Sequence, residues 1–203
     1  MTIKIYNFPR GARGLRAMWV CEEMSLAYDV AKVSFPTDDA YRKMNPMGSV
    51  PFLEDGAVAI NESVAIMLYL AERYGPTPLL PGRDDPAFAR VLQMCVFSEA
   101  TLGAGLNTLM AAHFVAPEAD KRNWSVRATE GRVDQALAYI EHLLGDNAYA
   151  AGAAFSLADI AITTALGMRQ GALGQAPSPK LGAYRDRMMT RPAYERAKAR
   201  AAG

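Results

Sequence analysis

The stretch Asn45–Gly75, NPMGSVPFLEDGAVAINESVAIMLYLAERYG, decides how the first part of the chain folds. Residues Val50 to Leu53 predict a short apolar strand, Asp55-Gly56 is a tight-turn dipeptide, and Val58 to Ile60 predict the returning strand. Apolar residues at helical spacing follow, and the pattern closes at Gly75. The stretch therefore predicts a β-hairpin followed by a helix.

Pro51 is unusual in a strand, because proline has no N–H to donate and is normally confined to strand edges, strand starts or bulges. A cis Val50-Pro51 bond would turn the N–H and C=O of Val50 toward solvent. Those two groups could then pair with an extended, peptide-like ligand, as in the addition of a strand to a sheet edge. The simpler interpretation is that Pro51 only starts the strand.

Glu62 and Ser63 are predicted to lie at the N-terminus of the helix that follows the hairpin. Free backbone N–H groups, the positive end of the helix dipole and a serine hydroxyl meet there, which suits a ligand carboxylate. Alternatively, Ser63 or Asn61 only caps the helix. Together with the turned-out Val50 backbone, however, the pattern indicates a site for a small, extended, zwitterionic peptide.

The pattern N-P-x-G-x-V-P followed by an E-S helix start resembles the glutathione-binding half of the soluble glutathione transferases. The resemblance implies that Val50, with Pro51, binds the cysteinyl backbone of glutathione and that Glu62 and Ser63 bind its γ-glutamyl end. Ser49 stands where family members often place a further glutathione contact. A solvated turn serine is the alternative interpretation of Ser49.

The first 75 residues predict a small mixed sheet. A strand ending near Tyr6 or Asn7 is followed by a helix over 15–26, a strand over 28–34, a short link, and the hairpin and helix described above. This order predicts a thioredoxin-like α/β domain with a right-handed crossover, and the resemblance implies the same fold. The proline-rich stretch 76–86 predicts the linker to a second domain.

Residues 87–203 predict helices alone. One long helix starts near Ala87, and its glycines at 103 and 105 predict a bend; a second runs from Trp124 to Leu144. Ser156 and Asp159 resemble a capping box at the start of another helix, and two prolines open two shorter helices, over 179–189 and 192–201. The fold class is thus a thioredoxin-like domain followed by an all-α bundle domain.

A transferase of this kind needs a hydrogen-bond donor or positive potential at the glutathione sulfur, so that the thiol ionises at neutral pH. The resemblance places that donor at the end of the first strand or in the loop after it. The loop contains no serine or cysteine, which departs from the family pattern. Tyr6 is the first candidate donor, although strand alternation could point it away from the site, and Asn7 and Arg10 are the others.

The resemblance implies that the helical domain supplies the pocket for the electrophile and that the protein is a homodimer. Apolar and aromatic residues on the long helix could line this pocket, but most of them are equally expected in the core or at a dimer contact. They are Met94, Leu102, Leu106, Met110, His113 and Phe114. Arg16, on the first helix, is expected to be a solvated charge on an exposed face.

Composition narrows the class of protein and its partners. The 203 residues are 51% hydrophobic with a formal net charge of +1, which is typical of a soluble globular protein and gives no basic field for nucleic acid. Cys21 and Cys95 lie in apolar helical patterns and are expected to be buried thiols, which fits a reducing compartment. No membrane span or signal peptide is predicted, so a cytoplasmic location is expected.

No metal or nucleotide cofactor is expected, because His113 and His142 have no partner at metal-ligand spacing and no phosphate-binding glycine motif is present. The resemblance therefore implies a detoxifying transferase that joins glutathione, its co-substrate, to a soft electrophile. Peroxide reduction, ring isomerisation, dehalogenation or ether cleavage on the same fold are alternatives. A non-catalytic glutathione-binding protein is another, because Gly11 and Ala12 stand where an activating serine would be expected.

Overall fold

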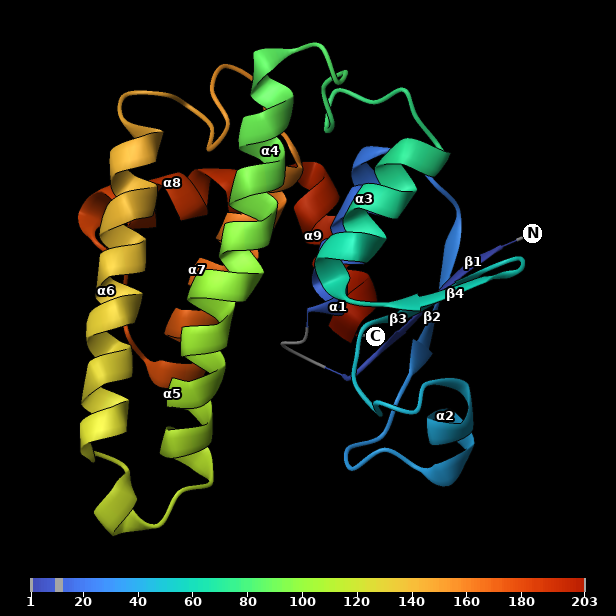
Figure 1. Cartoon of the computed structure of the whole chain (residues 1–203). Helices are drawn as coiled ribbons and strands as arrows, with labels where there is room; N and C mark the ends of the chain where they lie inside the picture. The colour runs from blue at the N-terminus through green and yellow to red at the C-terminus, as the bar shows by residue number, and fades with distance from the viewer. Residues whose placement is uncertain (1, 10–12, 203) are drawn as a thin grey trace. The chain divides into compact units, whose positions relative to one another are not determined.

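The computed structural model describes residues 2–9 and 13–202, and the chain divides into two compact units (Figure 1). The first unit is Met1–Leu80 together with Met189–Gly203, and the second is Pro81–Met188. The expected ranges, 1–75 and 87–203, differ from these units mainly at the C-terminal end. That end groups with the first unit because its last helix packs on the first helix.

The first unit contains a four-stranded mixed sheet in the order β2-β1-β3-β4. Its strands are β1 (Ile3–Asn7), β2 (Tyr28–Lys32), β3 (Phe52–Asp55) and β4 (Val58–Asn61). β1 pairs in parallel with β2, whereas β3 is antiparallel to both β1 and β4. The predicted mixed sheet and hairpin are confirmed.

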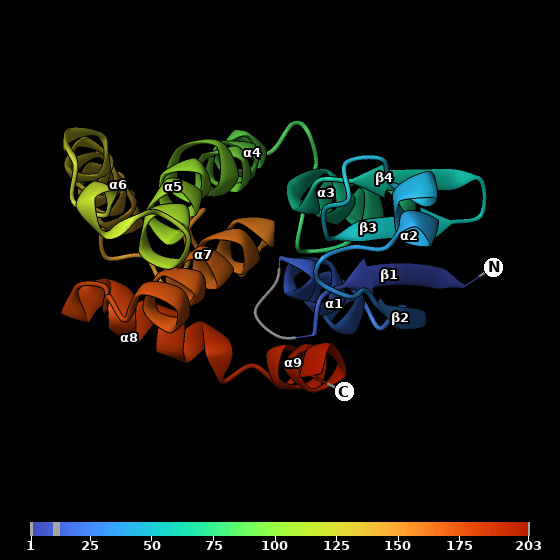
Figure 2. The same cartoon turned by 90° about the horizontal axis from the view of Figure 1, so that it is seen from below.

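Helices lie on both faces of this sheet. The parallel pair is joined through α1 (Gly14–Glu23), which packs on β1 and beside α3 (Ser63–Arg73), as Figure 2 shows from below. α1 ends before the predicted residue 26, because Ser25 has a left-handed backbone with φ +55°. On the other face, α2 (Asp39–Met44) covers a cluster of aromatic residues that β1 and β3 contribute.

The last helix, α9 (Pro192–Ala202), forms a further layer of the first unit by packing on α1. The rings of Trp19 and Tyr194 meet edge to face at 4.9 Å between centroids. The Arg191 guanidinium donates to both oxygens of Glu23, at 2.6 and 2.8 Å, which is the bidentate geometry of a strong pair. These contacts explain why α9 belongs with the sheet.

Asp55, at the end of β3, ties the hairpin to the end of α3. Its Oδ2 accepts hydrogen bonds from the hydroxyls of Tyr74, at 2.7 Å, and Tyr69, at 2.8 Å. These bonds, that from Tyr74 above all, favour the ionised carboxylate and lower the pKa of Asp55 below its ordinary 3.8. The same carboxylate raises the pKa of Tyr74 to about 12.

We expect the stabilisation from the Asp55 carboxylate to be lost in acid. Because the native pKa is lower than the unfolded one, the contribution is complete above the ordinary value of 3.8 and disappears as the pH falls through the lowered native value. The free energy of unfolding, measured with urea, should therefore differ between wild type and Asp55→Asn at neutral pH. This difference should shrink steadily below the ordinary value, and a difference that stays constant in acid would contradict the expectation.

The second unit is helical throughout its elements. They are α4 (Pro86–Val96), a π-helical stretch η1 (Phe97–Gly103), α5 (Ala104–Phe114), a 3-10 turn η2 (Glu118–Asp120), α6 (Trp124–Leu144), α7 (Leu157–Leu173) and α8 (Pro179–Met189). α4, η1 and α5 form one continuous helix (Figure 1). Near the glycines where the sequence predicted a bend, this helix has a π-helical segment that ends at Gly103.

The predicted capping box is confirmed at the start of α7. Oδ2 of Asp159 accepts from the Ser156 N–H at 2.8 Å, while Oδ1 accepts from the Ala150 N–H at 2.8 Å and the Tyr184 hydroxyl at 2.7 Å. Burial raises the pKa of Asp159, although these hydrogen bonds oppose the shift. One buried carboxylate thereby joins the loop before α7 to α8.

Within residues 2–9 and 13–202, no helix has both the length and the apolar character needed to cross a lipid bilayer.

Candidate functional site

Three separate segments of the first unit meet at one end of the sheet. Phe52 of β3 pairs with Tyr6 of β1 on one side and with Asn61 of β4 on the other. Both pairings are antiparallel, so Asn7, Pro51 and Glu62 each lie one residue beyond this row. Because neighbouring strands lie about 5 Å apart, the three backbones are adjacent there.

The central segment, before β3, is held by two buried side chains: Asn45, the first residue of the N-P-x-G motif, and Tyr41, which the sequence reasoning did not single out. The carbonyl oxygen of Ser49 accepts from the Tyr41 hydroxyl at 2.6 Å and from Nδ2 of Asn45 at 2.8 Å. Asn45 opens the N-P-x-G motif and is 3% exposed, so the motif has a structural reason: its first residue anchors the strand that follows. The Val50-Pro51 bond is cis, which was one of the two interpretations of Pro51, and Val50 lies outside the ladder.

The start of α3 offers donors for an anion. Glu62 is the N-cap residue, with an exposed side chain that makes no capping hydrogen bond, and its backbone has φ +67°. Residues other than glycine rarely adopt that conformation, and they do so most often at functional sites. The backbone N–H groups of the first turn have no helical acceptor, so they and the dipole favour negative charge.

Arg16 was expected to be a solvated charge on the protein surface. That expectation is wrong. Arg16 is 1% exposed, and its Nη1 donates to Oγ of Ser63, itself 2% exposed, at 2.9 Å. Arg16 lies on the face of α1 that packs against α3, and this contact between two helices buries it. Sequence periodicity alone does not reveal which face of α1 meets α3.

Asn7, at the end of β1, is buried but has no partner for its amide. It is 2% exposed, and neither Nδ2 nor Oδ1 has a hydrogen-bond partner among residues 2–9 and 13–202. Its side chain reaches the start of α1: a Cβ added to Gly14 would lie 2.4 Å from Oδ1 of Asn7, so only glycine leaves this space. A buried amide without partners indicates a site where a water or ligand atom binds.

Tyr6 faces the opposite side of the sheet from Asn7, because successive residues of a strand alternate. Its hydroxyl donates to Oε2 of Glu54 at 2.6 Å, and its ring packs with Tyr41 and Phe52 under α2. Burial, reinforced by Glu54, raises the pKa of Tyr6. A role for Tyr6 at the sulfur stays a prediction; the third candidate donor, Arg10, lies outside the described residues.

Both cysteines are buried, as expected, and neither forms a disulfide. Burial raises the pKa of the Cys21 thiol to about 12. Within the described parts of the chain, His, Cys, Asp and Glu side chains nowhere gather in a group of three that could hold a metal ion.

The candidate residues for the electrophile pocket divide into two groups. Met94, Leu102 and Leu106 are buried in the core of the helical unit, which was the alternative interpretation. His113 lines a cavity of about 370 Å³ between α5, α6 and the end of α7, with Lys121 and Arg122 nearby. Phe114 is 64% exposed, and Met110 is half-buried.

Two family models match the chain. The model described as "Glutathione S-transferase, N-terminal domain" matches residues 1–72, and the one described as "Glutathione S-transferase, C-terminal domain" matches residues 86–192. Among curated relatives, glutathione S-transferase Z1 of Arabidopsis thaliana is 39% identical over 39% of this chain and 38% of its own length. Glutathione S-transferase theta-1 of Bos taurus is 33% identical over 74% of this chain and 65% of its own length.

Solved structures resemble the chain over nearly its whole length. A glutathione transferase of Methylococcus capsulatus is 26% identical with a TM-score of 0.85, covering 98% of both chains. A theta class glutathione S-transferase of Xanthomonas axonopodis pv. citri, solved with glutathione bound, is 29% identical with a TM-score of 0.80, covering 97% of this chain and 96% of that one.

Proposed function

The chain belongs to the glutathione S-transferase family, and on that premise we propose that it joins the thiolate of glutathione to a soft, hydrophobic electrophile. The observation that supports this most strongly is the meeting of Asn7, Pro51 and Glu62 at one end of the sheet. Glutathione, a tripeptide, needs three partners: a backbone free to pair with its own, a site for its carboxylate and a donor for its sulfur. The Val50 backbone, the start of α3 and the Asn7 amide could supply them.

The cysteinyl residue of glutathione would bind as an added strand. Val50 lies beyond the ladder, so its N–H and C=O are placed to pair with the extended backbone of the ligand. Pro51 donates no backbone hydrogen bond and therefore ends the ladder at this point. The Ser49 hydroxyl would be a weaker, additional contact, and the Ser49 backbone is held in place through its carbonyl by Tyr41 and Asn45.

The γ-glutamyl end of glutathione carries an amine and a carboxylate, and the start of α3 offers a partner for each. The exposed Glu62 carboxylate suits the amine. The Ser63 hydroxyl and the backbone N–H groups of the first turn suit the carboxylate.

We propose that Asn7, rather than Tyr6, donates the hydrogen bond to the glutathione sulfur. Nδ2 of Asn7 has no partner among residues 2–9 and 13–202, and the Asn7 side chain lies beside Gly14 at the start of α1, whose positive dipole end favours a thiolate. The Tyr6 hydroxyl, by contrast, already donates to Glu54 on the other face of the sheet. Arg10, which lies outside the described residues, remains the third candidate as a source of positive charge.

In the reaction, the thiol loses its proton to solvent and the sulfur lone pair forms a new bond to the electrophilic carbon. With an aryl chloride, for example, the carbon–chlorine bond then breaks and chloride leaves with its electron pair. A mixed disulfide between the enzyme and glutathione is disfavoured, because Cys21 and Cys95 are buried. We further propose that the protein acts as a cytoplasmic homodimer whose helical domain binds the electrophile.

The test combines glutathione binding, measured by calorimetry, with conjugation of chlorodinitrobenzene, followed by absorbance. We expect the wild type to bind and to turn over. Ser63→Ala should weaken glutathione binding roughly 10-fold or more, because a hydrogen bond to a charged group is lost. Ser34→Ala is the matched control, since Ser34 is exposed and donates only to Pro36 within its loop.

The outcomes separate the alternatives. Binding without any turnover would favour a non-catalytic glutathione-binding protein. Binding with turnover of a peroxide, but not of chlorodinitrobenzene, would favour another glutathione-dependent reaction. Failure of the wild type to bind glutathione would contradict the proposal itself.

A further inference from the structure

The contact between Arg16 and Ser63 is a buried charged interaction in direct reach of the proposed glutathione site. Nη1 of Arg16, on α1, donates to Oγ of Ser63, the first residue of α3, at 2.9 Å, and both side chains are at least 98% buried. An arginine side chain is seldom buried this far unless its charge interacts with another polar or charged group. This contact therefore requires an explanation beyond the packing of two helices.

The direction of this hydrogen bond determines what the Ser63 hydroxyl can do. A serine hydroxyl has one proton to donate and two lone pairs that accept. Because Arg16 is only a donor, Oγ of Ser63 must accept from it, and the hydroxyl proton is left for another acceptor. Within residues 2–9 and 13–202, no acceptor for that proton is found. The proton is thus available to a ligand oxygen.

The charge of Arg16 acts in the same direction. A guanidinium shielded from water attracts an anion more strongly than one on the surface. The Arg16 guanidinium donates to the Ser63 hydroxyl at the first turn of α3. The backbone N–H groups of that turn and the helix dipole also favour negative charge. Hydroxyl, backbone and buried charge all favour a carboxylate and disfavour a neutral group.

We propose that Arg16 is a positioning residue that orients the Ser63 hydroxyl and makes the start of α3 selective for the carboxylate of the γ-glutamyl residue. This inference rests on the proposed function of the same site. It assigns Arg16 no contact with the sulfur or the electrophile. Its effect is therefore on which ligands bind rather than on the chemical step.

Two analogues of glutathione separate the groups of the γ-glutamyl end. γ-Aminobutyryl-cysteinyl-glycine lacks only the α-carboxylate, and glutaryl-cysteinyl-glycine lacks only the α-amine. We expect the wild type to bind glutathione roughly 10- to 100-fold more tightly than the analogue without the carboxylate, as for a charge-assisted hydrogen bond. In Arg16→Met this preference should fall to a few-fold, while the preference over the analogue without the amine stays unchanged.

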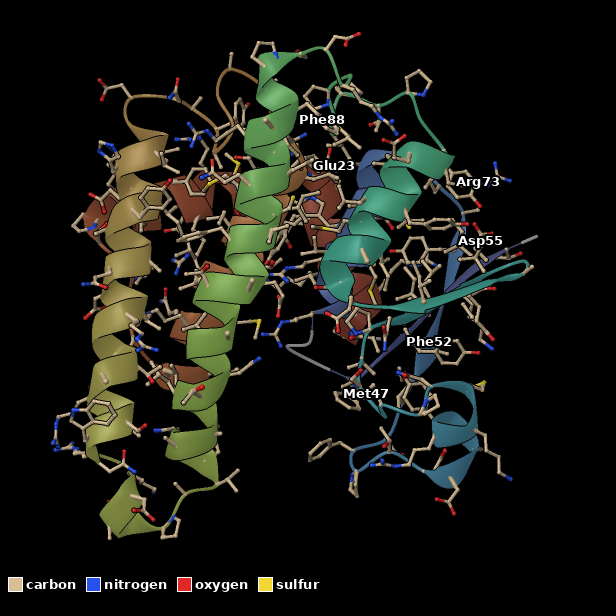
Figure 3. All side chains as sticks on the ribbon, in the orientation of Figure 1. Glu23, Met47, Phe52, Asp55, Arg73 and Phe88 are labelled. Carbon is tan, nitrogen blue, oxygen red and sulfur yellow. The ribbon has the colours of Figure 1, made fainter. Side chains whose placement is uncertain are left out.

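Arg73→Met is the matched control. Arg73 is the last residue of α3, whereas Ser63 is the first. Figure 3 labels Arg73 on α3, and its loss should leave both preferences as in the wild type. The ratio of two dissociation constants, measured by calorimetry, does not depend on the fraction of folded protein. A structural role of Arg16 alone would lower stability without changing this ratio.

Arg16→Lys carries the test if Arg16→Met does not fold. The lysine ammonium is a compact charge without the planar fork of arginine, so it should hold Ser63 less well and lower the preference for the carboxylate at least several-fold. An unchanged preference in either folded variant would overturn the inference while leaving the proposed function intact. If the wild type binds no glutathione, the proposed function fails instead.

Discussion

Asn7→Ala is expected to lower the conjugation rate at neutral pH roughly 30-fold, the equivalent of losing about 2 kcal/mol of hydrogen bonding to a charged sulfur. The reason is that Nδ2 of Asn7 is, in our proposal, the donor that stabilises the glutathione thiolate. Without it, the ascending limb of the pH profile of kcat/KM should move to higher pH, toward the pKa of a free thiol. Steady-state kinetics across pH measure both effects.

Tyr6→Phe is the matched control for Asn7→Ala. It removes a hydroxyl from the neighbouring residue of the same strand, but from the opposite face of the sheet, where it donates to Glu54. We expect its pH profile to coincide with that of the wild type. If Tyr6→Phe instead moves the profile and Asn7→Ala leaves it in place, Tyr6 is the donor and the assignment of Asn7 is wrong.

Asp159→Ala is expected to destabilise the protein by about 3–4 kcal/mol, because four buried donors lose their acceptor at once. The donors are the backbone N–H groups of Ala150 and Ser156 and the hydroxyls of Ser156 and Tyr184. For a chain of this length the loss corresponds to roughly 10 °C in the unfolding midpoint. Calorimetric or circular-dichroism melting measures it.

Tyr184→Phe tests whether the carboxylate is the centre of this network. It removes one of the four donors and leaves Asp159 with its partners at Ala150 and Ser156, so we expect a loss of only about 1 kcal/mol. Equal losses in the two variants would mean that the hydrogen bond from the Tyr184 hydroxyl accounts for the whole effect, and that the other donors to the Asp159 carboxylate contribute little.

Local patterns in the sequence predicted much of the fold. The hairpin at Asp55-Gly56, the cis bond before Pro51, the capping box of Ser156 and Asp159 and the span of α6 all depend on residues close together in the chain. Turn chemistry, capping and helical periodicity operate at that range, which is why these features could be found.

Features that depend on contacts between distant segments could not be found in the same way. Arg16 was expected in solvent, because the pattern of α1 does not say that α3 covers that face. The π-helical stretch η1 differs from an α-helix only in its hydrogen bonding, and the glycine at its end predicted a bend instead. The grouping of α9 with the sheet depends on Tyr194 and Arg191 meeting α1.

The candidate site shows the same division. The segment with Val50 and Pro51 and the helix start at Glu62 and Ser63 were indicated by a local motif. The choice of donor for the sulfur was left open among Tyr6, the first candidate, Asn7 and Arg10, because the sequence does not fix the orientation of the last strand residues. In the structure the Asn7 side chain lies against Gly14, whereas the Tyr6 hydroxyl donates to Glu54 on the opposite face of the sheet, and the identity of the donor stays a prediction.

The most direct measurement is the ultraviolet absorbance of the thiolate of glutathione bound to the wild-type protein, followed as a function of pH. A free cysteine thiol has a pKa of about 8.5. The account predicts that the bound thiol titrates at least about one pH unit lower, so that thiolate is present at neutral pH. Glutathione that binds but titrates like the free thiol would contradict the claim that this site activates the sulfur.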